Sequence, residues 1–121
     1  MQTVYQTRIT QIGSSVFDFI EDKIFVLFGE NAPSDVADYC LLIHVNDVEG
    51  EIEKGDVLLL DGVEYTITSV GSKVARNLKL LGHITLQFDG RETEGLPGTL
   101  YLENKDFHKP GIGGEIKIIR K

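Results

Sequence analysis

Short apolar runs separated by turn residues recur along the whole chain, and their length predicts β-strands rather than buried helices. Some runs alternate apolar and polar residues, as in Val63 to Val70, whereas others are continuous, as in Ile24 to Phe28. The predicted strands cover residues 4–12, 24–28, 39–45, 56–60, 63–70, 84–88, 99–102 and 115–119. Many short strands with glycine-rich turns between them are typical of a barrel or a sandwich.

Turn signals support this reading. Asp61-Gly62 separates two apolar runs and suits a tight primed turn, which predicts a hairpin. Asp89-Gly90 and Pro97-Gly98 separate later strands. The stretch Gly111-Ile112-Gly113-Gly114 lacks the Lys-Ser/Thr ending and the following helix of a phosphate-binding loop, so it is predicted to be a turn.

Three segments have helical spacing or a helix-start signal: residues 14–22, 33–38 and 72–81. We expect them to be short covers over the openings of a barrel. The predicted fold class is therefore all-β: a small closed or partly closed β-barrel with one to three short helices. A length of 121 residues is enough for one hydrophobic core, and no repeat or linker interrupts it, so residues 1–121 are predicted to form a single domain.

Charge and targeting signals narrow the functional classes. The net charge of −7, with scattered basic residues, opposes binding to a phosphate backbone, so nucleic acid is not an expected partner. No apolar stretch approaches the roughly 20 residues that cross a bilayer, and no membrane insertion is expected. The first residues lack the pattern of a secretory signal, which predicts a cytoplasmic protein.

The remaining residues give little sign of a cofactor or metal site. Cys40 is the only cysteine and is predicted to be a small buried apolar residue. The three histidines are separated by 39 and 25 residues, which matches no metal-ligand motif. The carboxylates, including the cluster from Asp47 to Glu53, lie mainly in polar stretches and are predicted to be solvated. No cofactor and no metal are expected.

Two histidines carry the candidate chemistry. His44 ends a predicted strand whose alternation places Cys40, Leu42 and His44 on one face, and His83 follows Gly82 at the start of another strand. A neutral imidazole is both a nucleophile and a proton carrier near pH 7, so these positions suggest group transfer. A purely structural role remains the alternative for each. His108 lies in a turn-rich stretch and is predicted to be exposed and without a role.

Several blocks of the sequence, in one order, resemble the glucitol/sorbitol-specific enzyme IIA component of the bacterial phosphoenolpyruvate-dependent sugar phosphotransferase system. They are Tyr5-Gln6-Thr7, Ile12-Gly13, Ala32-Pro33, Tyr39-Cys40, Val70-Gly71-Ser72, the stretch from Asn77 to Gly90 and Pro97-Gly98-Thr99. The resemblance covers nearly the whole chain. It implies a phosphocarrier that accepts a phosphoryl group on histidine from the small carrier HPr and passes it to the IIB domain of a glucitol permease, without magnesium.

The resemblance also bears on the site. The family's phosphorylated histidine lies in a Tyr-Cys-Phe-Ile-His stretch, and an ungapped match places Ile43 there, with His44 one position later. A bulge near Leu42 would absorb that shift. His83 falls on the family's Gly-His block without a gap. We expect His44 to be the attacking group and His83 to assist, with the reverse assignment open; Ser72 is a further candidate donor. The competing hypothesis is a non-catalytic β-barrel binding or regulatory module with structural histidines.

Overall fold

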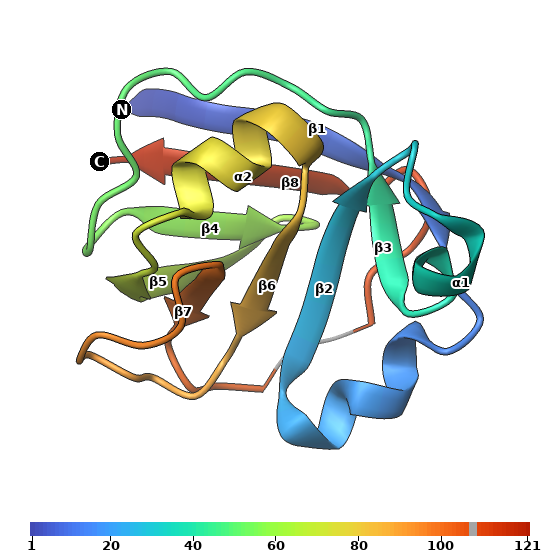
Figure 1. Ribbon diagram of the computed structural model, residues 1–121. Coiled ribbons are helices and arrows are strands. Elements are labelled where there is room, and N and C mark those ends of the chain that lie inside the picture. The colour runs from blue at the N-terminus through green and yellow to red at the C-terminus, as the bar shows by residue number, and fades with distance from the viewer. Residues whose placement is uncertain (107–108) are drawn as a thin grey trace.

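The computed structural model describes residues 1–106 and 109–121, and its strands form a closed barrel in the order β1-β3-β2-β6-β7-β5-β4-β8 (Figure 1). The pairs β2·β3 and β6·β7 are parallel, and the other neighbouring pairs are antiparallel. The strands are β1 (Gln2–Ile12), β2 (Ile24–Gly29), β3 (Cys40–Ile43), β4 (Val57–Leu60), β5 (Val63–Val70), β6 (Ile84–Gln87), β7 (Thr99–Leu102) and β8 (Glu115–Arg120). The predicted all-β barrel is confirmed.

Three short helices accompany the barrel: the 3-10 helix η1 (Val16–Asp22), α1 (Ser34–Ala37) and α2 (Val74–Leu81). Val16 of η1 and Val74 and Leu78 of α2 are buried members of the hydrophobic core. Because strands form the barrel wall, side chains from helices reach the interior only through its ends. η1 and α2 therefore cover openings of the barrel, as predicted, whereas α1, predicted to be a third cover, buries none of its residues.

The local predictions agree with the structure at the turns and differ mainly at strand ends. Asp61 and Gly62 both have positive φ, 52° and 86°, and join β4 to β5 as the predicted primed hairpin. β3 is shorter than predicted, because the regular ladder stops at Ile43 and leaves His44 just beyond its end.

β1 belongs to two parts of the barrel wall. Residues Gln2 to Arg8 pair with β8, and Ile9 to Ile12 pair with β3. The register of β1 shifts between Thr3 and Tyr5 and again between Ile9 and Gln11. Irregularities of this kind bend and twist a strand, which closes the barrel. They also bring the middle of β1 alongside the end of β3.

Glycines allow α2 to pack closely on the end of β2. A Cβ atom on Gly29 would lie 2.5 Å from Val45 Cγ2 and 2.6 Å from the Leu81 carbonyl oxygen. Gly82 follows α2 with a left-handed φ of 65°, and its N–H is directed at carbonyls of the last helical turn. The end of α2 and the start of β6 are thus fixed against the end of β2.

We predict that Gly29→Ala destabilises the protein, because backbone as well as side-chain atoms would have to move. The free energy of unfolding from denaturant titration should fall by about 1–3 kcal/mol. Gly111→Ala is the matched control: a Cβ atom there meets nothing within 4 Å. Its effect should stay within about 0.5 kcal/mol. Equal stability of the two variants would contradict the packing described for Gly29.

Candidate active site

Arg8 of β1, His44 just after β3 and Glu30 just after β2 form a row across three adjacent strands or their ends. Ile43 pairs with Ile9 of β1 on one side and with Gly29 of β2 on the other. His44 therefore lies opposite Arg8 and beside Glu30, and its backbone N–H is 3.4 Å from the Arg8 carbonyl oxygen. Residues that lie opposite each other in paired strands project to the same face. His44 thus lies between the positions of Arg8 and Glu30 on the outer face.

The His44 ring is exposed and oriented. Its Nδ1 lies 3.1 Å from Glu30 Oε1, and 67% of the His44 side chain is exposed. A carboxylate oxygen only accepts, so this hydrogen bond assigns the proton to Nδ1. In the neutral ring Nε2 then carries the free lone pair. The ring lies on an open pocket of about 520 Å³ lined by Gln6, Thr7, Arg8, Thr10, Glu30, His44 and Asn46.

The neighbouring position is unsuitable for surface chemistry. Ile43 is 0% exposed and belongs to the hydrophobic core, together with Leu41, which shares its face of the strand. The expected irregularity does lie beside Leu42, but the extra residue is Thr10 on β1: Ile9 and Gln11 pair with the consecutive residues Ile43 and Leu42. β3 itself runs in regular register along β2. His44, one position after Ile43, therefore reaches the outer face without a bulge in its own strand.

Hydrogen bonds fix the backbone around His44. The Thr7 hydroxyl donates to the His44 carbonyl oxygen at 2.5 Å. Asn46 Nδ2 donates to the Gln6 carbonyl oxygen at 2.8 Å, and the Glu49 N–H donates to the Val4 carbonyl oxygen at 2.8 Å. The segment that follows His44 is thereby held along β1, so the ring projects from a defined backbone.

His83 occupies a more enclosed position. It is half-buried, stacks on Phe28 with ring centroids 4.2 Å apart, and places Nδ1 3.1 Å from the Leu27 carbonyl oxygen. A carbonyl oxygen also only accepts, so Nδ1 again carries the proton and Nε2 the lone pair. The ring lines a smaller pocket of about 210 Å³ with Asn77, Ile84, Thr85, Leu96, Gly98 and Thr99.

The two histidines lie on opposite sides of β2. His44 follows β3 and His83 precedes β6, and both strands pair with β2. The structure places the two rings in different pockets with different hydrogen-bond partners. Ser72 lies before α2, whereas His83 comes just after the helix, so the eight-residue helix separates them.

An apolar surface lies between the histidines. We call it the apolar edge, formed by Phe28, Pro33, Val45, Leu80 and Leu81, which line a pocket of about 280 Å³ with Gly29 and Asn31. Leu80 and Leu81 are 62% and 51% exposed. Phe28 contacts His83, and Val45 adjoins His44 in the chain, so this edge connects the surroundings of the two rings. Exposed apolar side chains beside reactive groups are typical of a protein-docking surface.

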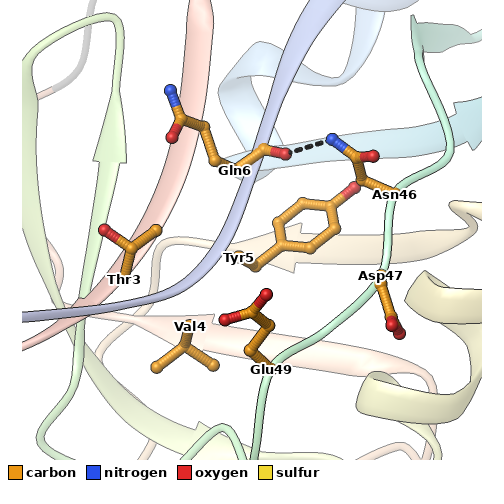
Figure 2. Close-up of a pocket in the computed structure, with 7 residues that line it drawn as sticks. All are labelled: Thr3, Val4, Tyr5, Gln6, Asn46, Asp47 and Glu49. Atoms are coloured by element: carbon orange, nitrogen blue, oxygen red, sulfur yellow. Dashed lines mark hydrogen bonds between the residues drawn. The ribbon is translucent and has the colours of Figure 1, made fainter.

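A further pocket lacks histidine. Figure 2 shows the Tyr5 ring between β1 and the segment that carries Asn46 and Glu49. The Tyr5 hydroxyl is buried and has no hydrogen-bond partner of good geometry among the described residues. Burial raises the pKa of Tyr5 to about 12, and the nearby Thr7 hydroxyl offsets part of that rise. With one buried phenol and no paired acid and base of suitable geometry in its lining, this pocket offers weaker chemistry than that beside His44.

The remaining predictions concern Cys40, metal ligands, membrane-spanning helices and His108. Cys40 is buried, as predicted; its Sγ is 3.3 Å from the Val36 carbonyl oxygen, and burial raises the pKa of the thiol. Within residues 1–106 and 109–121, no three His, Cys, Asp or Glu side chains gather as metal ligands would. Over the same ranges, none of the helices has the length and apolar character needed to cross a membrane. His108 lies outside the described residues.

Neither motif spacing nor periodicity in the sequence distinguishes Glu30, Arg8 or the residues of the apolar edge. Glu30 follows Gly29 after an apolar run, which is a weak signal that many surface carboxylates share. Arg8 occupies a polar position of an alternating strand, where solvent exposure is the ordinary explanation. Only the order of the strands shows that both flank His44.

Comparisons with known proteins agree on one family. The family described as the PTS system glucitol/sorbitol-specific IIA component matches residues 4–117. Proteins with the corresponding name from Escherichia coli (strain K12) and Shigella flexneri are each 38% identical over 102 residues, which cover 84% of this chain and 83% of theirs. The crystal structure of a PTS system IIA component from Enterococcus faecalis V583 has a TM-score of 0.80 at 30% identity, covering 93% of this chain and 97% of that chain.

We predict that Tyr5→Phe protects the protein at alkaline pH. The pKa of Tyr5 is higher in the folded state than in the unfolded state. The contribution of the protonated phenol to the free energy of unfolding is therefore fully present below pH 10 and is lost as pH rises to about 12. By pH 11.5 the wild-type free energy of unfolding should therefore have fallen by about 2 kcal/mol more than that of the variant. Denaturant titrations between pH 7 and pH 11.5 measure this. Tyr39→Phe, at an exposed ring, should leave the wild-type profile unchanged; equal profiles for Tyr5→Phe and wild type would refute the assignment.

Proposed function

Because this chain belongs to the family of glucitol/sorbitol-specific IIA components of the phosphoenolpyruvate-dependent sugar phosphotransferase system, we propose that His44 is its phosphoryl acceptor. In this proposal the protein takes the group from HPr and passes it to the IIB domain of a glucitol/sorbitol permease. It acts as a single-domain carrier in the cytoplasm. The observation that supports this most is the exposed His44 ring, held through Nδ1 by Glu30 and open at Nε2.

The proposed chemistry exchanges one nitrogen–phosphorus bond for another. The lone pair of His44 Nε2 attacks phosphorus in line, and the bond between phosphorus and the donor imidazole breaks, with its electron pair returning to the donor nitrogen. Nδ1 keeps its proton, and the Glu30 carboxylate stabilises the positive charge that develops on the ring. Reversal of the same step on an acceptor side chain of IIB returns His44 to its starting state. No cofactor or metal takes part in this proposed step.

The surroundings of the two histidines favour His44 over His83 as the acceptor. An in-line attack requires free approach along one direction from Nε2. The His44 ring is largely exposed on the wider pocket, whereas His83 is half-buried against Phe28. We assign His83 an indirect role: its ring fixes Phe28, and through it the apolar edge.

The apolar edge is consistent with a donor and an acceptor that are both proteins. It lies beside His44, and Lys79 at the end of α2 forms a 3.3 Å ion pair with Asp47 of the segment that follows the histidine. A carrier must present the same imidazole to HPr and then to IIB. We therefore propose that both partners use this edge in turn.

We predict that His44→Ala reduces phosphate uptake by at least about a hundredfold, because the nucleophile is removed. His83→Ala should only slow it. The test is incubation with phosphoenolpyruvate, enzyme I and HPr, followed by intact mass measurement under neutral or basic conditions. Full labelling of folded His44→Ala would move the acceptor to another residue. Unlabelled wild-type protein would instead favour the non-catalytic binding module.

We predict that Leu80→Asp lowers kcat/KM for phosphorylated HPr about tenfold, because it places a charge on the apolar edge. The effect should lie mainly in KM for phosphorylated HPr, since His44 and Glu30 are unchanged. Tyr39→Asp is the control: Tyr39 is also an exposed apolar residue, but it precedes β3, at the opposite end of that strand from His44. Equal effects of the two variants would contradict docking at the apolar edge.

A further inference from the structure

The proposed phosphoryl transfer uses His44 and Glu30 but gives no role to Arg8, which belongs to the same site. It lies opposite His44 across the β1·β3 pair, and both side chains line the same open pocket. Of the described residues that line this pocket, Arg8 is the single lysine or arginine. The cross-strand position places its guanidinium within reach of a group attached to the neighbouring imidazole.

The Arg8 side chain is anchored, and among the residues that the structure describes one hydrogen bond occupies its guanidinium. Its Nη1 donates to the Gly113 carbonyl oxygen at 3.1 Å. Gly113 is itself held to β1, because its N–H donates to the Ile9 carbonyl oxygen at 2.7 Å. A guanidinium has five N–H donors, so one hydrogen bond to a turn orients the group and leaves the others free. This arrangement lowers the entropy that would be lost on binding an anion.

The charges of the pocket require a cation once a phosphoryl group is present. A phosphoryl group adds about −1.5 to −2 charges at neutral pH. It would join the Glu30 carboxylate in a chain whose net charge is already −7. Glu30 is committed to Nδ1 and repels the added oxygens, so the site needs a positive partner on its other side. Arg8 occupies that side.

We propose that the guanidinium of Arg8 binds the phosphoryl oxygens of phosphorylated His44. This inference rests on the proposed function, and it adds a phosphate-binding residue to the site. Arg8 forms no covalent bond; it stabilises the phosphorylated state relative to the free one. Its removal should therefore shift the equilibrium of phosphoryl exchange with HPr.

The experiment measures that equilibrium by intact mass at known ratios of phosphorylated to free HPr. Arg8→Gln should lower the equilibrium constant by about fivefold, and Arg8→Lys should restore much of it, because the charge returns without the planar fork. The difference between wild type and Arg8→Gln should shrink as salt is raised. Phosphoramidate is a small phosphoryl donor that needs no protein docking. With it, the extent of phosphorylation should rank the variants in the same order as with HPr.

Arg91→Gln is the matched control. Arg91 is also exposed and also donates from its guanidinium to a backbone carbonyl oxygen, that of Glu94 at 3.1 Å, but it follows the far end of β6. It should leave the equilibrium unchanged. An unchanged constant in Arg8→Gln, with His44 still labelled, would overturn the role of Arg8 and leave the proposed function standing. Unlabelled wild-type protein would overturn both.

Discussion

The position of β3 between β1 and β2 is the constraint on which the candidate site depends. Side chains alternate along a strand, so a slip of one residue would bring His44 into the core and expose Ile43. Ile43 is held in register on both sides, by Ile9 and by Gly29. In the β1·β3 pair the extra residue, Thr10, lies on β1, which leaves β3 regular. Burial of one isoleucine thus determines the exposure of the neighbouring histidine.

Much of the fold is predictable because its signals are local. Short apolar or alternating runs identify the strands, and Asp61-Gly62 identifies the hairpin. The order of the strands is not local information. β3 pairs with β1 and with β2, and β6 pairs in parallel with β7, through contacts between distant segments. The sequence therefore predicts a barrel but not which strands are neighbours within it.

The same distinction explains which parts of the site are predictable. His44 and His83 can be found from their chemistry and from their positions at strand ends. Glu30 and Arg8 are ordinary surface residues until β2 and β1 are placed on either side of β3. The separation of the two histidines is likewise a property of topology, since β2 lies between the strands that carry them. Composition and periodicity carry no information on that arrangement.

The proposed carrier function places opposing demands on one surface. A group that is received from one protein and given to another must be bound well enough to react and weakly enough to leave, and transient interfaces meet this demand by being small. The apolar edge is suited to that, because its few exposed side chains, such as Leu80 and Leu81, offer a limited area beside His44. The imidazole meets the same demand chemically. In the proposed reaction, Glu30 would stabilise the ring as it becomes cationic and would repel the phosphoryl oxygens, so the carboxylate would favour transfer without making the phosphorylated ring too stable to pass the group on.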